Sequence, residues 1–328
     1  MAEAKTEELS DPRAAQAFYE DRYAHGYMEE WPDEKKRRIA EVVGALGLPP
    51  SGSALDFGCG NGVLTDVLRR ALPPGWSVLG TDLSANAVKN ARERFPGSAF
   101  ATGDSPEVTG QRFDLVFTHH VLEHVHDVRE ILDSLAARVA PGGGMLHILP
   151  CGNPGSYEHG LCLARIGGIE SARENRFFFE EEGHLRRLST DDMRELCAAR
   201  GFRLAGEWYS NQRDGAFAWL TLADPGLIAD LTDERRAVDR AAARKLRRLR
   251  RQLKLLRALR LPAYGVDARL RRGLRSARDW AILAVGLPLY PLSKLVDAWI
   301  ERRWHAEWRA RKRDPRGSEM FLWLQREC

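Results

Sequence analysis

The stretch Ala54–Gly62, Ala-Leu-Asp-Phe-Gly-Cys-Gly-Asn-Gly, is the most informative part of this 328-residue chain. It begins with apolar residues of a short buried strand, and apolar residues recur at helical spacing after it, so the glycines lie on a strand-to-helix turn. Gly58, Gly60 and Gly62 have no Cβ, so the backbone can turn tightly there and approach a ligand closely. The helix that follows offers unpaired N–H groups. The stretch therefore predicts a ligand-binding turn.

An acidic residue at the end of the predicted strand distinguishes this turn from a dinucleotide site. A dinucleotide fingerprint reads Gly-x-Gly-x-x-Gly and holds a pyrophosphate at a helix N-terminus. Here the pattern is Asp56-x-Gly58-x-Gly60-x-Gly62. A carboxylate at this position repels a pyrophosphate but suits a cationic ligand.

Further motifs follow the turn at distances that fit alternating strands and helices. Asp82 comes 20 residues after Gly62, as one β-α-β unit requires. An acidic residue that ends the second strand of a nucleotide-binding fold accepts hydrogen bonds from ribose hydroxyls. The motifs are, in chain order, Val78–Ser84, Gly103-Asp104-Ser105, Phe113–Phe117 followed by Thr118–Val125, and Val139–Ile148.

Together these motifs resemble those of the class I S-adenosylmethionine (SAM) methyltransferases, over roughly residues 15–223. The resemblance implies that SAM is the cofactor, that the glycine turn lies under its methionine part, and that an acidic residue at Asp104 meets its adenine amino group. The residues expected to bind the cofactor are Tyr19, Asp56, Gly58, Cys59, Gly60, Asn61, Gly62, Asp82, Leu83, Asp104, Ser105 and His119. The alternative is a Rossmann-like domain whose ligand site is different or lost.

The predicted fold class is α/β, a Rossmann-like, seven-stranded, doubly wound sheet with an antiparallel last strand, plus a C-terminal helical region. Residues 1–50 are expected to form N-terminal helices or a lid. Residues 51–223 would form the SAM-binding domain, with a substrate-side insertion at residues 151–188, and residues 224–328 a basic amphipathic helical region.

Two details of this domain are open to test. Phe202–Ser210 and Ala216–Ala223 are predicted as a closing hairpin, of which the second strand ends the sheet. In the N-terminal helices, aromatic residues such as Tyr19, Tyr23 and Tyr27 either pack against the sheet or form a lid over the cofactor.

Two histidines are candidate general bases. A hydroxyl or amine acceptor of a methyl group must lose a proton, usually to His, Asp or Glu. His120 follows the fourth predicted strand and is expected to point toward the acceptor, and His184 resembles a histidine in the substrate half of the family. For each, a hydrogen-bonded structural histidine is the alternative.

A metal site is considered at the same place and is not expected. His120-Val-Leu-Glu123-His124 resembles the Glu-x-x-Glu-His metal motif of the ubiquinone-pathway O-methyltransferases, with His in place of the first Glu. His can still ligate a divalent metal. Leu-Glu-His is also common in metal-free relatives, however.

Composition and charge place the chain among intracellular globular proteins with a basic appendage. Its five cysteines are widely spaced and odd in number, which favours reduced thiols and a cytoplasmic location. The acidic N-terminus does not resemble a signal peptide, and no transmembrane helix is expected. The net charge is −13 over residues 1–234 and +15 over residues 235–278.

The basic region has three interpretations. Residues 235–261 and 266–278 are predicted as two basic helices, the first with a narrow apolar seam of Ala242, Leu246, Leu249, Leu253 and Leu256. Trp280–Ile300 is apolar, interrupted by prolines and bounded by tryptophans, a composition typical of a membrane interface. Attachment to an anionic membrane surface is therefore favoured over a bundle that dimerises through the seam, and nucleic acid binding is least favoured.

The sequence thus predicts a SAM-dependent methyltransferase. Its acceptor would be a hydroxyl on a lipid-linked, glycolipid or other amphipathic molecule, and the protein would lie on the inner face of the membrane. One alternative is a soluble methyltransferase of small molecules or saccharides, with a tail that forms a homodimer. A second alternative is a non-catalytic adaptor with the SAM-binding fold.

Overall fold

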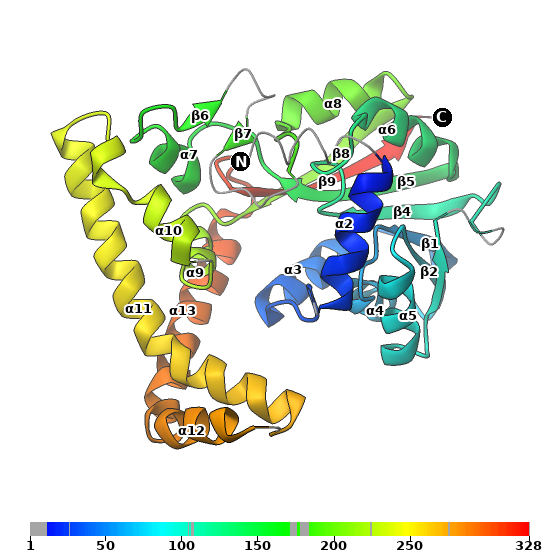
Figure 1. Ribbon diagram of the computed structural model, residues 1–328. Helices are drawn as coiled ribbons and strands as arrows, with labels where there is room; N and C mark the ends of the chain where they lie inside the picture. The colour runs from blue at the N-terminus through cyan, green and yellow to red at the C-terminus, as the bar shows by residue number, and fades with distance from the viewer. Residues whose placement is uncertain are drawn as a thin grey trace.

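A seven-stranded sheet with the strand order β3-β2-β1-β4-β5-β9-β8 forms the centre of the molecule (Figure 1). The structure is a computed structural model that describes residues 12–25, 27–103, 105, 108–170, 176–177, 184–223, 225–274 and 276–327. The strands of the sheet are β1 (Ser51–Phe57), β2 (Gly75–Asp82), β3 (Ala99–Thr102), β4 (Phe113–His119), β5 (Val139–Pro150), β8 (Phe202–Ser210) and β9 (Glu319–Arg326). Strands β1 to β5 pair in parallel, and β9 lies antiparallel between β5 and β8. The predicted fold class is confirmed.

Helices cover both faces of the sheet. The helices before β8 are α2 (Pro12–Ala24), α3 (Asp33–Gly44), α4 (Val63–Ala71), α5 (Ala85–Arg94), α6 (Val128–Ala137), α7 (Tyr157–Cys162) and α8 (Thr190–Ala198); β6 (Ile169–Glu170) and β7 (Arg176–Phe177) form a small separate ribbon. Buried apolar side chains of α3 and α4 form one core with the sheet, and those of α6 and α8 form a second core. Each sheet face is thus a separate hydrophobic layer, as in doubly wound folds.

The strand that completes the sheet does not lie where the sequence analysis placed it. Residues 216–223 were expected to be this strand, but Asp214–Leu220 form helix α9, and Glu319–Arg326 form the antiparallel strand. Short apolar runs of this kind fit a buried helix as well as a strand. The boundary predicted at residue 223 therefore does not separate the sheet from a tail. Residues 211–318 are an insertion between β8 and β9.

The insertion forms a helical arm that leaves the sheet and returns to it (Figure 1). It contains α9 (Asp214–Leu220), α10 (Pro225–Leu231), η2 (Glu234–Arg236), α11 (Arg240–Arg272), α12 (Ala277–Gly286), η3 (Leu287–Leu289) and α13 (Tyr290–Arg311). Two basic helices were predicted where the structure has the single helix α11, which continues through Pro262. We call residues 277–299, where the chain turns back, the elbow.

The apolar seam of α11 is covered within the chain. Ala242, Leu246, Leu249 and Leu253 are buried against side chains of α7, α9 and α10. A seam that already packs inside the protein is not exposed to a second copy. The hypothesis of a bundle that dimerises through this seam is therefore no longer supported by an exposed apolar seam.

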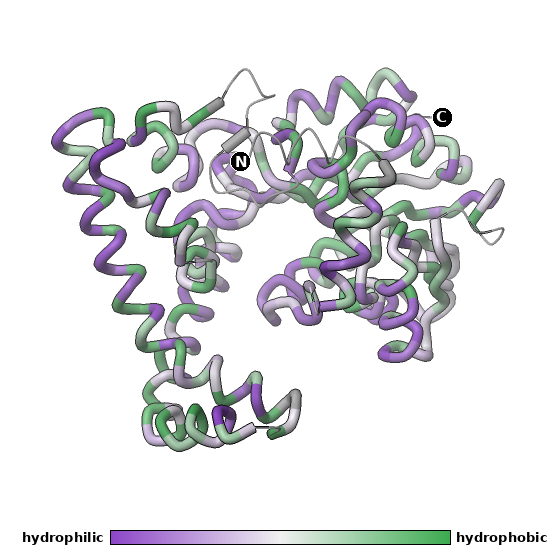
Figure 2. Tube along the Cα trace, in the orientation of Figure 1, coloured by the Kyte–Doolittle hydropathy of each residue, from purple (hydrophilic) through white to green (hydrophobic). Residues whose placement is uncertain are grey.

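The elbow is the most apolar exposed part of the described chain. Residues 277–311 make a helical run that is long and apolar enough to cross a membrane by length and composition. An 18-residue window within it has a mean hydropathy of 1.3, and 17% of that window is buried. The sequence analysis expected no such helix because no stretch of 18 residues is wholly apolar. Figure 2 shows apolar residues along α12 and mainly hydrophilic ones along the first half of α11.

Candidate functional site

A cavity of about 420 Å³ lies at the carboxyl ends of β1, β2 and β4. Among the residues that the sequence analysis assigned to the cofactor, the cavity is lined by Tyr19, Asp56, Gly58, Cys59, Gly60, Asn61, Asp82, Leu83 and His119. Gly62 and Ser105 do not line it, and Asp104 lies outside the described residues. Ligands of open α/β sheets bind at this edge, so the fold brings most of the predicted set to one place.

The glycine turn has the conformation that the sequence suggested. Gly58, Gly60 and Gly62 all have positive φ angles, of 80°, 52° and 76°. A Cβ on Gly58 would lie 2.4 Å from Val121 Cγ2, and one on Gly60 would lie 2.8 Å from the Tyr23 hydroxyl. Both the backbone angles and the close approach therefore require glycine, and the turn leaves the cavity open above it.

Two carboxyl groups at the strand ends lie next to this turn, Asp56 buried and Asp82 partly buried. Asp82 accepts hydrogen bonds from the Gly60 and Ser84 backbone N–H groups, both at 2.9 Å. Asp56 accepts one from the Thr65 hydroxyl at 2.6 Å. Burial raises the pKa of Asp82, and burial together with the charge of Asp82 raises that of Asp56 to about 7. Desolvated carboxyl groups that face a cavity favour a ligand with a positive charge.

Aromatic side chains of the N-terminal helices form one wall of the cavity. Tyr19, Tyr23, Tyr27 and Trp31 all line it, and the Tyr19 hydroxyl hydrogen-bonds to His124 Nδ1 at 2.9 Å. Burial raises the pKa of Tyr23. The lid interpretation of this aromatic stripe is therefore the one that the geometry supports.

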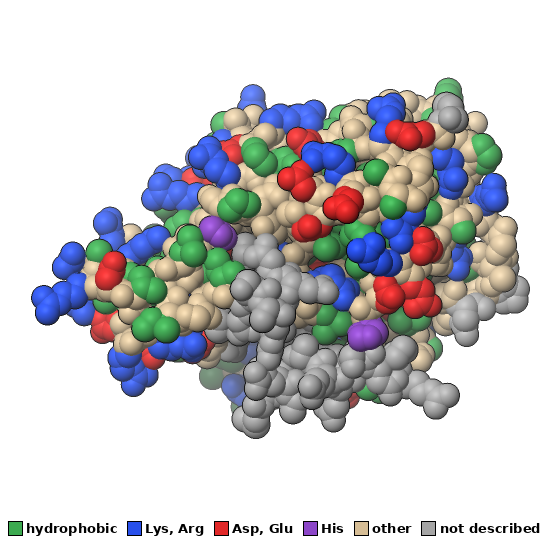
Figure 3. All heavy atoms as spheres, turned by 90° about the horizontal axis from the view of Figure 1, so that it is seen from above, with side chains coloured by type: hydrophobic (Ala, Val, Ile, Leu, Met, Phe, Trp, Pro, Cys, Tyr) green, Lys and Arg blue, Asp and Glu red, His purple; other side chains and the backbone are tan. Residues whose placement is uncertain are grey.

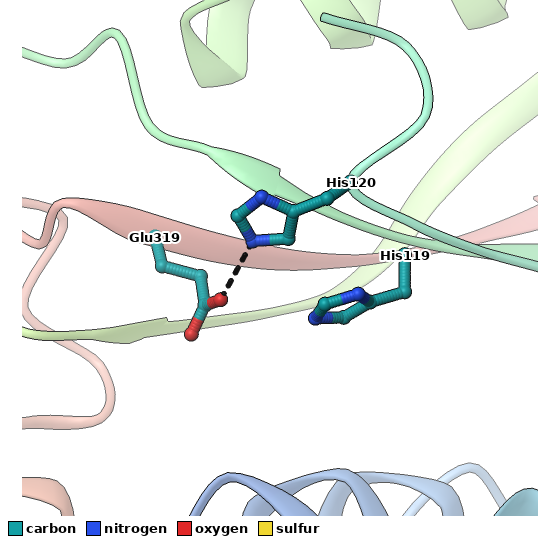
Figure 4. Close-up of side chains that lie close together, drawn as sticks. All are labelled: His119, His120 and Glu319. Atoms are coloured by element: carbon teal, nitrogen blue, oxygen red, sulfur yellow. Dashed lines mark hydrogen bonds and ion pairs between the residues drawn. The ribbon is translucent and has the colours of Figure 1, made fainter. Parts of the chain in front are cut away.

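His120 lies between two buried carboxylates. Its Nδ1 is 2.9 Å from Glu123 Oε1 and its Nε2 is 3.0 Å from Glu319 Oε1, a residue of β9 (Figure 4). Burial and the charge of Lys35 lower the pKa of His120, but the two carboxylates outweigh them, so the pKa is raised. With φ at 52°, His120 also has a backbone conformation that is uncommon outside glycine.

The other histidines of the site differ from His120 in their surroundings. His119 is buried beside His120, and burial and the charges of Lys35 and His120 lower its pKa well below its usual range. His184 is buried with its ring against that of His124, and its Nε2 is 3.9 Å from Glu123 Oε1. Both predicted bases, His120 and His184, therefore line the cavity, and each ring nitrogen of His120 lies within 3.0 Å of a carboxylate oxygen.

Two groups of side chains in this cluster are close enough to hold a metal ion. They are His119, His120 and Glu319, and His120, Glu123 and His184. The first group already contacts a cation of the protein itself. Lys35 Nζ lies 2.7 Å from Glu319 Oε1 and 3.4 Å from His120 Nε2. An ammonium at this place supplies the positive charge that a metal ion would bring.

A second cavity, of about 120 Å³, lies on the other side of His120. It shares Met28, Trp31, His120 and His184 with the first cavity. Its remaining lining residues are Pro32, Lys35, Pro150, Glu158, Arg187, Asn211, Trp219, Trp304, Ser318 and Glu319. His120 thus stands at the junction of a larger cavity and a smaller one.

The sequence analysis did not find several residues of the second cavity. Lys35 lies in a helix that was expected only to pack on the sheet, and Trp304 and Glu319 lie in the region expected to be an appendage. The continuous apolar run of residues 320–324, followed by polar residues, was a signal for a buried strand. Pairing of this strand with β5 and β8 is what brings Glu319 to His120.

Comparison with known proteins identifies the larger part of the chain. A family model described as a methyltransferase domain matches residues 23–206, more than half of the chain. Trans-aconitate 2-methyltransferase of Variovorax paradoxus is 32% identical over 124 residues, which are 37% of this chain and 47% of the relative. Ubiquinone biosynthesis O-methyltransferase of Brucella ovis is 34% identical over 97 residues, 28% of this chain and 38% of the relative. The chain thus spans about half the length of the curated relatives it matches, or less.

Two solved structures of methyltransferases have a similar fold. Magnesium protoporphyrin IX methyltransferase of Synechocystis PCC 6803, with bound S-adenosylhomocysteine, is 19% identical, covers 62% of this chain and 94% of that one, and has a TM-score of 0.46. A putative sarcosine dimethylglycine methyltransferase of Galdieria sulphuraria is 13% identical, covers 89% of this chain and 85% of that one, and has a TM-score of 0.45.

Proposed function

The chain belongs to the methyltransferase-domain family and is a class I SAM-dependent methyltransferase, and from this premise we propose that it methylates a hydroxyl group of an amphipathic acceptor at an anionic membrane surface. Acceptors of this kind are glycolipids, lipid-carried saccharides and quinone precursors. The observation that carries the proposal is the exposed apolar elbow. It belongs to the same helical arm that contributes Trp219 and Trp304 to the lining of the second cavity. The proposed location is the cytoplasmic face of the membrane.

The residues around His120 can prepare an acceptor hydroxyl. SAM, when bound, supplies an electrophilic methyl group, and the residues that would hold it are the glycine turn, Asp82 and the aromatic wall. His120 Nε2 lines the second cavity and can accept the hydroxyl proton once the imidazole is neutral. Glu123 holds the other ring nitrogen and so fixes the ring orientation. Lys35 stabilises negative charge that develops on the acceptor oxygen.

The elbow exposes apolar side chains that a soluble surface seldom groups together. Seven large apolar side chains of the elbow are at least 49% exposed: Trp280, Val285, Leu287, Leu289, Leu292, Leu295 and Trp299. Exposed apolar groups in one place mark interaction sites. Trp and Leu beside basic residues are the composition of a helix that lies in a membrane interface.

The path of the chain favours insertion of the elbow over a complete crossing. The run of residues 277–311 is interrupted at η3, and its C-terminal part packs on the body through Trp304 and Trp308. Both ends of the arm return to the same sheet (Figure 1). This path supports entry of residues 277–299 into lipid rather than a complete crossing.

The basic face of α11 supplies a second attraction to anionic lipid. Arg244, Lys245, Arg247, Arg248, Arg251 and Lys254 are exposed. Figure 3 shows Lys and Arg side chains gathered at the end of the molecule that carries the arm. Each basic residue near an anionic surface contributes about 1 kcal/mol, and charge together with apolar insertion gives stable attachment where one signal alone is marginal.

Vesicle flotation tests the membrane part of the proposal. Full-length protein should float with vesicles of phosphatidylglycerol and phosphatidylcholine at low salt, and high salt should weaken binding. Leu295→Asp should lower binding about tenfold or more, because a buried Leu side chain contributes about 1.5–3 kcal/mol. Leu163→Asp is the matched control, since Leu163 is similarly exposed but lies after α7. Unbound wild-type protein, or equal effects of the two substitutions, contradicts the proposal.

A further inference from the structure

Beside its histidines, the second cavity is lined by two basic residues and two carboxylates, which form two ion pairs. Lys35 contacts Glu319 at 2.7 Å, and Arg187 contacts Glu158 at 3.0 Å. His120, whose pKa is raised, stands between Glu319 and Glu123. All four side chains of the two ion pairs are at most 9% exposed. The protein therefore offers no surplus positive charge along this wall.

We propose that this cavity is the acceptor subsite, that it takes an uncharged ring bearing hydroxyl groups, and that the Lys35–Glu319 pair excludes carboxylate acceptors. The proposal rests on the proposed function, since it specifies the acceptor of the same reaction. It also sets this chain apart from the relatives named as trans-aconitate methyltransferases, whose named substrate carries carboxylates.

Electrostatics decide between a hydroxyl and a carboxylate. A carboxylate that enters the cavity loses its hydration and must approach Glu319, a like charge, to reach Lys35. A desolvated charge without its own partner is strongly disfavoured. A hydroxyl can accept from Lys35 and donate its one proton either to Glu319 or to neutral His120, so it joins the ion pair without adding a charge.

Three tryptophans provide surfaces for the ring. Trp31 precedes α3, Trp219 lies on α9 and Trp304 on α13, and all three line the cavity. Trp304 is fixed because its Nε1 donates to Asn211 Oδ1 at 2.8 Å, and Arg38 donates to the same oxygen at 3.1 Å. Aromatic faces of this kind bury the apolar face of a ring and leave its hydroxyls for the polar wall.

Backbone conformation marks the same cavity independently. In the part of the chain that the structure describes, the non-glycine residues with positive φ are Met28, His120 and Asn211, with φ angles of 50°, 52° and 61°. All three line the second cavity. Unfavourable backbone conformations gather at ligand sites, where the surrounding structure maintains them.

The test compares neutral and anionic probes on protein loaded with S-adenosylhomocysteine, without vesicles. Calorimetry measures binding of methyl β-D-glucopyranoside, 4-methylphenol and trans-aconitate. We expect saturable binding of one neutral probe and none of trans-aconitate, and the neutral probe that binds shows whether the ring is a saccharide or a phenol. In Glu319→Gln, the amide can still accept the Ser210 hydroxyl bond, but Lys35 loses its counter-charge. Affinity for trans-aconitate should then rise about tenfold or more, because a hydrogen bond to a charged group contributes about 1.5–3 kcal/mol.

Glu93→Gln is the matched control, since it removes the same charge from an exposed position of α5. It should leave the binding of all three probes unchanged. Wild-type protein that binds trans-aconitate as tightly as Glu319→Gln overturns the proposal, and so does the absence of binding by both neutral probes. Affinity for SAM, measured in the same samples, shows separately whether the methyltransferase assignment holds, and flotation shows whether the membrane part holds.

Discussion

The two cavities that meet at His120 are built in different ways. The glycine turn and the two strand-end carboxyl groups of the larger cavity all come from residues 56–83, which form one β-α-β unit. The smaller cavity takes Lys35, Glu158, Trp304 and Glu319 from elements spread over almost the whole chain. A site made by one local motif is recognisable in a sequence, whereas a site made by distant elements requires the topology.

The largest effect should come from removing residues 224–328. The sequence analysis regarded these residues as an appendage, but they contain β9, whose residues 320–324 are at most 5% exposed and pair with β5 and β8. Without β9 both neighbouring strands become open edges. We expect the truncated protein to lose cooperative thermal unfolding, as measured by circular dichroism.

A second variant tests whether the arm and the sheet are separable. Replacing residues 277–289 with a Gly-Ser linker of equal length keeps β9 and removes most of the elbow. This variant should unfold cooperatively and bind SAM, but should not float with anionic vesicles. A soluble, cooperatively folded truncation at residue 223 would show that β9 is dispensable and that the two regions are independent after all.

His120→Ala should give the next largest effect. Loss of a general base lowers turnover about 10²–10⁴-fold, and affinity for SAM should be retained because the glycine turn and Asp82, which would hold the cofactor, are unchanged. Turnover on a hydroxyl acceptor and calorimetry with SAM measure the two quantities separately. Near-normal turnover would remove His120 from the mechanism and leave His184 as the remaining predicted base.

The pH profile provides a finer check on the same residue. The charged and titratable groups around His120 are Lys35, His119, Glu123, His184 and Glu319. The pKa of His120 is raised, and the neutral imidazole is the form that accepts a proton. Therefore kcat/KM should increase with pH through a pKa above the usual value of about 6.5. A profile that is flat across this range contradicts the assignment.

Arg38→Ala should destabilise the protein by about 3–5 kcal/mol, because it removes the buried partner of the Glu34 carboxylate and leaves only the more exposed Arg37 and His305 beside it. Arg38 is 2% exposed, donates to Glu34 at 3.0 Å, and also donates to Asn211 and to the Trp304 carbonyl. Arg37→Ala is the control, since Arg37 pairs with the same Glu34 but its side chain is 56% exposed. Exposed pairs contribute about 0.2–1 kcal/mol. Urea unfolding measures the loss of stability in both variants. Equal losses would mean that the bonds from Arg38 of α3 to Asn211 and Trp304 do not stabilise the attachment of the arm.

Asp82→Ala should have the smallest of these effects. Asp82 accepts two backbone hydrogen bonds within the glycine turn, and its carboxylate is expected to accept ribose hydroxyls. Loss of such a charged acceptor costs about 1.5–3 kcal/mol of SAM binding. Calorimetry with SAM and S-adenosylhomocysteine measures it. Unchanged affinity would show that the predicted ribose contact is absent.

Local chemistry explains which parts of the molecule were predictable. The glycine turn, Asp82 and the strand Phe202–Ser210 were found because a strand-to-helix turn and an alternating strand have short sequence signals. The strand of residues 319–326 was missed because its partners, β5 and β8, lie far away in the chain. Lys35 was missed because the helical pattern around it does not show which basic residue will contact the Glu319 carboxylate. Pairing across the sheet is information that periodicity does not contain.

The position of β9 in the chain also affects how the protein is made. Domains begin to fold from the N-terminal side during synthesis, so the β-α-β unit around the glycine turn is available while the arm is still being translated. The edges of β5 and β8 stay open until residues 319–326 leave the ribosome, and distant strand pairing is slow. Glu319 arrives with this strand. A nascent chain therefore acquires its cofactor-binding turn first, and the acceptor subsite is completed only when the sheet closes.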